Sequence, residues 1–438
     1  MKKTVAKVRL WGTTVGAVSL EEGQKSAQFE YAQSFLSSGI ELSPIMMPLR
    51  GGVYHFPGLA YESFHGLPGL LADSLPDKFG NELIDLWLAK EGRLTGSFNA
   101  VEKLCYTGKR GMGALEYEPA LSEDAKKSEK INVAGLVELA SMVLSNRSNL
   151  REVLDECDRR NLSHTLQKII SLGTSAGGAR AKAVIALNPN TNEVRSGQIE
   201  AGKGFEYWII KFSGVNNNKD KEDTADLADY GMIEYVYYLM AVECGIEMMP
   251  CKLLDDGQNH HFMTKRFDRT EDGGKLHMQS LGALGHFDYN KAGSTSYEQA
   301  FAALNKLNVG HPDKVELFRR MVFNVFACNC DDHVKNISFL MNKKGEWSLA
   351  PAYDIAFSHN SVVGSWTSSH QMTINGKRKD FKKTDFDNCA EIAGLKKKEK
   401  NDLFEKVSSS VAKWKDFAKQ VGVSEDRFVA INKHLIVL

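Results

Sequence analysis

A polar stretch between two apolar runs carries the residues best suited to chemistry. It reads Asn329-Cys330-Asp331-Asp332-His333-Val334-Lys335-Asn336 and lies between the runs 321–326 and 337–341. Buried flanks would leave its charges partly desolvated unless they met cations or each other, whereas an exposed loop would hold them at little cost. The Asp331-to-Asn336 spacing is that of the protein-kinase catalytic loop. The stretch suggests Asp331 as a base and Asn336 as a metal ligand, with an ordinary surface loop as the alternative.

A second carboxylate follows, where Asp354 stands in the otherwise apolar segment 347–357. An isolated carboxylate is costly to bury unless it meets a cation or hydrogen-bond donors. A magnesium–phosphate site needs such an acidic ligand. Asp354 is therefore predicted to bind the metal together with Asn336.

Two features upstream have residue types that bind phosphate. The glycine-rich loop 175–178 precedes a strand expected over 183–187, and it would let backbone N–H groups approach an anion, although structural turns have the same composition. Lys211 lies in another expected strand. It either reaches the surface from an edge strand or binds nucleotide phosphates as a kinase lysine does. Glu234 either faces solvent or pairs with Lys211.

The hydrophobic pattern predicts an α+β protein that would position these residues. Alternation over 5–49 indicates a small β domain, with a hairpin turn at Gly12 and strand character over 29–31 and 41–49. Helices are expected over 81–90, 133–144, 230–244, 297–304 and 312–326, and strands over 183–187, 206–212 and 261–269. Ser74 or Asp77 would cap the helix over 81–90. The segment after 261–269 would give adenine its backbone hydrogen bonds.

Composition indicates an ordinary folded protein of two or three domains, with 438 residues of which 42% are hydrophobic. Lys+Arg and Asp+Glu balance at 55 each, so net charge gives no reason to bind nucleic acid or an anionic membrane alone. The seven scattered cysteines, with Cys328 and Cys330 too close for a redox pair or zinc site, indicate reduced thiols in the cytoplasm. The N-terminus Met-Lys-Lys-Thr-Val-Ala-Lys lacks an apolar core, so no signal peptide is expected, and without an apolar run of 18 residues no membrane span is expected.

The four chemical features stand in the order that a kinase needs. The chain also carries the Ser175-to-Lys182 loop and these motifs: Asn329-x-Asp-x-His-x-Lys-Asn, Ala352-Tyr-Asp-Ile, Lys265-Arg-Phe-Asp-Arg, Trp208-Ile-Ile-Lys, Gly66-Leu-Pro-Gly followed by Leu75-Pro-Asp, and Arg110-Gly-Met-Gly-Ala-Leu. In these motifs it resembles the HipA-type serine/threonine kinases, the toxins of bacterial toxin–antitoxin modules, over nearly its full length.

The resemblance implies a three-part fold with the ATP site between two lobes. These parts are an N-terminal β-rich subdomain over 1–120, a kinase-like N-lobe with a mixed sheet over 121–275, and a mainly helical C-lobe over 276–438. Asp331 would be the catalytic base, and Asn336 and Asp354 the Mg²⁺ ligands. The nucleotide-binding residues would be Lys211, Ser175, Ala176, Gly177, Gly178, Lys265, Arg266, Phe267, Gln279, His333 and Lys335.

Regulation is also implied by the resemblance. Ser175 matches a serine that family members autophosphorylate to inactivate themselves, and a phosphate there would compete with those of ATP. Many relatives have prolines where this chain has Ala176 and Ala181. Asp332 either raises the pKa of its neighbour or points outward. His370 and Asn375 match a family element whose role the sequence does not reveal.

The partners implied are a helix-turn-helix antitoxin of the HipB type, operator DNA bound through it, and a protein substrate. Family members phosphorylate an aminoacyl-tRNA synthetase, typically the glutamyl enzyme. Two alternatives stay open from the sequence: a kinase of another protein or of a small molecule, and a non-catalytic subunit that docks the antitoxin on DNA. Intact Lys211, Asp331, Asn336 and Asp354 argue against the second.

Overall fold

The computed structural model describes residues 3–90, 92–121, 180–198, 200–215, 229–271 and 273–436. The helix expected over 133–144 and the loop holding Ser175, Ala176, Gly177 and Gly178 therefore lie outside the described residues. The same holds for most of 121–130, whose charged composition indicates a linker, for the helical pattern that continues to 172, and for the polar segment 216–226.

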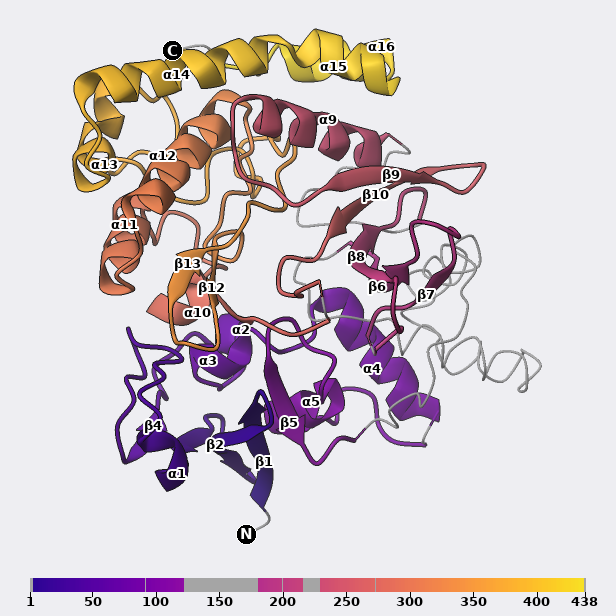
Figure 1. The fold of residues 1–438 in the computed structure, drawn as a ribbon, viewed down its shortest axis with the longest axis vertical. Coiled ribbons are helices and arrows are strands. Elements are labelled where there is room, and N and C mark those ends of the chain that lie inside the picture. Colours follow the sequence, from indigo (N-terminus) through magenta and orange to yellow (C-terminus); the bar gives the residue numbers. More distant parts are fainter. Residues whose placement is uncertain are drawn as a thin grey trace.

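The N-terminal part is built on a five-stranded antiparallel sheet in the order β4-β3-β2-β1-β5 (Figure 1). Its elements are β1 (Lys3–Leu10), β2 (Thr13–Glu21), β3 (Gln28–Tyr31), α1 (Gln33–Leu36), β4 (Val53–His55), α2 (Tyr61–Phe64), α3 (Gly69–Ala72), α4 (Lys78–Lys90), α5 (Ala100–Thr107) and β5 (Leu115–Glu118). The predicted hairpin is confirmed, and Gly12 in its turn has φ of +83°, a backbone conformation that favours glycine.

The strand character predicted over 41–49 is wrong. Only an isolated bridge between Ser43 and Met47 forms there, and the next strand is β4. Pro44 and Pro48 lack the N–H groups that a ladder needs. The Glu41 carboxylate also accepts the backbone N–H of Leu49 at 2.8 Å, so side chains satisfy the backbone in place of a neighbouring strand.

The second part is a five-stranded sheet in the order β7-β6-β8-β10-β9, with α9 packed on it. Its elements are β6 (Lys182–Leu187), β7 (Val194–Ser196), β8 (Glu206–Lys211), α9 (Tyr230–Glu243), β9 (Cys251–Asp255) and β10 (His260–Lys265). The strand pairs are all antiparallel, so the expected mixed sheet does not occur among the described strands. Lys182 and Lys211 are direct partners across β6 and β8, which places them on one face of the sheet.

The third part is mainly helical, as predicted, and it also contains the three-stranded sheet β11-β12-β13. Its elements are β11 (His277–Ser280), α10 (Leu281–Gly285), α11 (Tyr297–Lys306), α12 (His311–Phe326), β12 (Ser338–Met341), β13 (Trp347–Leu349), the 3₁₀ helix η1 (Lys383–Phe386), α13 (Asp387–Ile392), α14 (Lys397–Ala412), α15 (Trp414–Val421) and α16 (Glu425–Asn432). A core that includes Phe318, Phe323 and Trp414 joins these helices to α9. Helices α14 to α16 run across the top of Figure 1.

Close contacts fasten the N-terminal part to the third part. The Asp73 carboxylate, directly after α3, accepts hydrogen bonds from the backbone N–H and the hydroxyl of Ser280 at 2.7 and 2.9 Å. The N–H of Gly69 donates to Nε2 of His286 at 3.0 Å. A side chain at Gly69 would collide with the carbonyl oxygen of Ala283. These contacts fix α3 beside β11 and α10 of the third part.

Candidate active site

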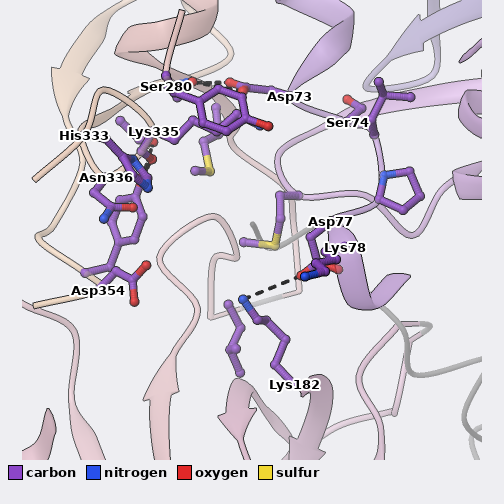
Figure 2. A pocket seen from close by; sticks show the side chains of 18 of the residues that line it. Asp73, Ser74, Asp77, Lys78, Lys182, Ser280, His333, Lys335, Asn336 and Asp354 are labelled. Carbon is purple, nitrogen blue, oxygen red and sulfur yellow. Dashed lines mark hydrogen bonds and ion pairs between the residues drawn. The ribbon is translucent and has the colours of Figure 1, made fainter. Parts of the chain in front are cut away.

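A cavity of about 800 Å³ lies where the three parts of the chain meet. Its walls come from the segment around α2 to α4, from the second sheet and from the loop after α12 (Figure 2). The fold brings together these predicted site residues, which all line it: Lys211, Lys265, Arg266, Phe267, Asp331, His333, Lys335, Asn336 and Asp354. A volume of this order is typical of small-molecule sites.

Lys211 is the centre of an ion-pair triad. Its Nζ lies 2.5 Å from Oε1 of Glu234 and 2.5 Å from Oδ1 of Asp354. Burial alone would lower the pKa of Lys211, but the two carboxylates raise it above its usual value. Burial would raise the pKa of Asp354, but Lys211 holds that pKa well below the usual range. At Glu234 the effect of burial is larger than that of Lys211, so the pKa of Glu234 is raised. Lys211 thus stabilises the charged form of Asp354, while burial disfavours the charged form of Glu234.

The triad decides between the alternatives that the sequence left open for Lys211 and for Glu234. Lys211 does not extend from an edge strand, because β8 lies in the middle of its sheet and the lysine lines the cavity. Glu234 does not face solvent, because only 1% of the residue is exposed. The sequence could not decide either point, since both depend on how α9 packs on the sheet.

The loop after α12 presents Asp331 to the cavity. Its backbone N–H donates to the Ser358 hydroxyl at 2.9 Å, and its Oδ1 accepts a hydrogen bond from the indole Nε1 of Trp366 at 2.8 Å. The side-chain Nδ2 of Asn336 donates to the backbone oxygen of Asp331 at 2.9 Å. This bond turns the amide so that its oxygen is the atom suited to a cation. Nε2 of His333 lies 3.8 Å from Oδ2 of Asp331.

Asp332 does not point outward, which was one of the two expectations for it. It is 3% exposed, and its carboxylate is bound by residues of the third part. It accepts hydrogen bonds from the Tyr297 hydroxyl at 2.9 Å, from Nδ1 of His370 at 3.0 Å and from the backbone N–H of Gln371 at 2.7 Å. The segment around His370 thus binds the 329–336 loop through Asp332, which does not line the cavity.

The end of β10 provides a wall suited to a flat ring. The backbone N–H groups of Lys265 and Arg266 are used inside the protein, by the oxygens of Pro250 and Tyr207 at 3.0 and 2.9 Å. Phe267 lies beyond them and also lines the cavity. Ile209, Met248, Phe267 and Met278 give this region apolar character.

A buried charge network supports that wall. Asp268 accepts hydrogen bonds from two nitrogens of Arg266 at 2.8 and 2.7 Å and from Arg269 at 2.8 Å. It also accepts the backbone N–H of Gly113, at 2.7 Å, from the N-terminal part. Burial would raise the pKa of Asp268, but the two arginines hold it well below the usual range.

Lys182 also lines the cavity, although it was not predicted as a site residue. Lys182 Nζ lies 3.6 Å from Oδ2 of Asp77, and both side chains are buried (Figure 2). The other oxygen of Asp77 accepts the N–H of Gly80 at 2.6 Å, so Asp77 caps α4, as one of the two expected residues. Burial raises the pKa of Asp77 although Lys182 opposes this. The Leu-Pro-Asp sequence ending at Asp77 was a signal for this site.

One predicted nucleotide residue lies elsewhere. Gln279 is fully buried, and its neighbours Met278 and Ser280 line the cavity in its place, because side chains alternate along β11. The predicted residues of the loop 175–178 are outside the described residues.

The residues present fit a magnesium ion better than zinc. No group of three or more His, Cys, Asp or Glu side chains suited to a metal occurs in the described part of the chain. Asp354 and Asn336 instead offer one carboxylate and one amide oxygen beside a cavity. Mg²⁺ typically takes few protein oxygens and completes its shell with water and substrate phosphates.

The fold and the cavity together define the class: a two-lobed, kinase-like α+β protein with an added N-terminal β domain. Sequence profiles agree with this description. The profile of the HipA N-terminal domain matches residues 6–118, and that of the HipA-like C-terminal domain matches residues 174–415. The chain belongs to the HipA family, which confirms the resemblance.

Individual relatives are similar over shorter stretches. "Putative kinase" of Haemophilus influenzae is 34% identical over 108 residues, which is 22% of this chain and 32% of the relative. "Putative kinase Y4dM" of Sinorhizobium fredii is 28% identical over 135 residues, 31% of this chain and 32% of the relative. The chain thus matches about a third of the length of these curated relatives.

A solved structure is similar over nearly the whole chain. HipA from Shewanella oneidensis, in a complex with HipB and operator DNA, is matched over 98% of this chain and 95% of that one, with a TM-score of 0.64 and 17% identity. This likeness confirms the predicted fold. Separately, none of the helices among the described residues is long and apolar enough to cross a membrane.

Proposed function

We propose that the protein is an ATP- and Mg²⁺-dependent serine/threonine protein kinase of the HipA type. The observation that carries this proposal is the triad in which Lys211 lies 2.5 Å from both Glu234 and Asp354, in the cavity that Asp331 and Asn336 also line. A strand lysine paired with a helix glutamate, a catalytic-loop aspartate and two oxygen ligands are the working parts of a phosphoryl-transfer site.

The nucleotide would bind with its adenine at the end of β10 and its phosphates near Lys211. Because the N–H groups of Lys265 and Arg266 are engaged within the protein, the N–H of Phe267 is the donor suited to adenine. The phosphates would attract Lys211 away from Asp354 and leave that carboxylate for the metal. Asp354 and Asn336 would hold Mg²⁺, which when bound neutralises charge on the transferred group.

Asp331 would act on the acceptor. A serine or threonine hydroxyl of the substrate attacks the γ-phosphorus while the bond from that phosphorus to the β–γ bridging oxygen breaks. The hydroxyl proton passes to Asp331, and ADP leaves. The hydrogen bond from Trp366 to Oδ1 of Asp331 orients the carboxylate for this transfer.

The biological setting follows from the family as a proposal. The Shewanella protein is titled as part of a toxin–antitoxin system with HipB and operator DNA. We infer for this chain a HipB-like helix-turn-helix antitoxin, operator DNA bound through it, a cytoplasmic location, and growth arrest through phosphorylation of an aminoacyl-tRNA synthetase, of the glutamyl type. Autophosphorylation at Ser175 would inactivate the enzyme.

Intact mass after incubation with Mg-ATP tests the proposal, with wild type and Asp331→Asn measured side by side. We expect one added phosphate on the wild type only, mapped to Ser175, and transfer to a synthetase substrate that Asp331→Asn abolishes. Mg-ATP binding should survive in Asp331→Asn and be lost in Asp354→Ala, as measured by calorimetry. Phosphate transfer at the wild-type rate by Asp331→Asn would refute the catalytic assignment.

A further inference from the structure

Three groups donate hydrogen bonds to the carboxylate of Asp332, the residue next to the proposed base Asp331. Both oxygens of Asp332 are used: Oδ2 by Tyr297 and His370, and Oδ1 by the N–H of Gln371. The Tyr297 hydroxyl also accepts a hydrogen bond from Asn324 at 2.9 Å. A buried carboxylate is costly unless it is satisfied in this way. A residue that served only as a surface part of the loop would not need these donors.

The segment that binds Asp332 also binds Asp331. We call residues 366–371 the strap. At one end, Nε1 of Trp366 donates to Oδ1 of Asp331 at 2.8 Å, and at the other end His370 and Gln371 hold Asp332. The Gln371 side chain closes the strap, because its Nε2 donates to the backbone oxygen of Trp366 at 2.6 Å.

We propose that Asp332 is a positioning residue for phosphoryl transfer: it anchors the strap, and the strap aims Asp331 through Trp366. The inference rests on the proposed function and adds a residue to it. Because Asp331 and Asp332 are adjacent in the chain, the strap holds the loop through two consecutive carboxylates. The base then keeps one orientation without being packed into the core.

The chain offers a matched control in Asp256. Its carboxylate likewise accepts a hydrogen bond from a histidine, Nε2 of His261 at 2.9 Å, and from the backbone N–H groups of Gln258 and Asn259 at 2.9 and 2.7 Å. It lies in the turn between β9 and β10 and does not line the cavity. Its side chain is 7% exposed, against 1% for Asp332, so Asp256→Asn removes a carboxylate with similar hydrogen-bond donors without touching the strap.

The experiment compares wild type, Asp332→Asn, Asp256→Asn, Trp366→Phe and the double variant Asp332→Asn/Trp366→Phe in steady-state phosphorylation of the substrate that the wild type modifies. We expect Asp332→Asn to lower kcat by about 10²-fold, because small misplacements of a reacting group have costs of that size. The KM for ATP should stay within twofold. Asp256→Asn should keep the wild-type kcat although its thermal stability falls.

The double variant shows whether Asp332 affects kcat through Trp366 or independently of it. If Asp332 acts through Trp366, Trp366→Phe lowers kcat by itself, and the double variant is no slower than the slower single variant. Three results would each overturn the inference. The first is a double variant whose fold-loss in kcat is the product of the two single losses, and the second is an unchanged kcat in Trp366→Phe. The third is an equal fold-loss in kcat for Asp332→Asn and Asp256→Asn. Trp366 is partly exposed, so its variant remains a test even if Asp332→Asn does not fold. An inactive wild type would refute the proposed function itself, a result distinct from these.

Discussion

Replacing Lys211 by methionine removes the cation between two carboxylates and keeps most of the apolar stem. The Glu234 side chain is 2% exposed, so it would remain buried without its paired lysine. The Asp354 side chain is 38% exposed and can regain water. Breaking a buried pair by removing one partner costs about 3–5 kcal/mol. Because solvent relieves Asp354, we expect a loss of about 2–4 kcal/mol in the free energy of unfolding near neutral pH.

The loss should depend on pH in a defined direction. Burial already raises the pKa of Glu234 in the folded protein, and removing Lys211 raises it further. A carboxyl group whose folded pKa exceeds its unfolded value destabilises the protein progressively as pH rises above the unfolded pKa of about 4.3. Asp354 has the opposite shift in the wild type, and its contribution is present above an unfolded pKa of about 3.9. The gap between wild type and Lys211→Met should therefore widen from pH 5 to pH 8.

Urea unfolding of four proteins at both pH values measures this: wild type, Lys211→Met, Lys211→Met/Glu234→Gln and Lys265→Met. The double variant should recover about 1–2 kcal/mol, because it leaves no buried charge at Glu234. Lys265 pairs with Glu206 at 2.8 Å in the same sheet, but both side chains are about a third exposed, so Lys265→Met should cost less than about 1 kcal/mol. Equal stabilities of Lys211→Met and Lys265→Met, or a double variant no more stable than Lys211→Met, would refute the reasoning.

Three further predictions concern contacts that hold the parts of the chain together near the cavity. Gly69→Ala should cost about 1–3 kcal/mol in thermal unfolding, because its Cβ would come 2.2 Å from the carbonyl oxygen of Ala283; wild-type stability would contradict this. Asp77→Asn keeps a good helix cap but removes the charge facing buried Lys182, so we expect a loss of about 2–4 kcal/mol, and an unchanged melting temperature would argue against a buried pair. Burial lowers the pKa of His286 to about 4, so its stabilising contribution is complete above about pH 6.5 and is lost as pH falls; the gap in unfolding free energy between wild type and His286→Phe should narrow from pH 7 to pH 4.5.

The sequence predicted those elements whose signals are local. The hairpin at Gly12, the helix α9 and the helix α12 each carry their own pattern of burial or turn residues, and they occur as predicted. Helix α5 was missed although Asn99 and Glu102 form a capping box, a signal that the sequence does contain. The strand predicted over 41–49 does not form because Pro44 and Pro48 lack the N–H groups that a strand ladder needs, whatever the pattern of apolar residues around them.

By itself, the sequence determined the family and which residue types stand at the spacing of a phosphoryl-transfer site, because motifs are a property of the chain. Only the tertiary structure decided which groups meet. Glu234 pairs with Lys211, Asp77 faces Lys182, and Asp332 turns away from the cavity toward His370. Packing between segments far apart in the chain decides which way a polar side chain faces. The same packing decides which partner compensates the cost of burying that side chain.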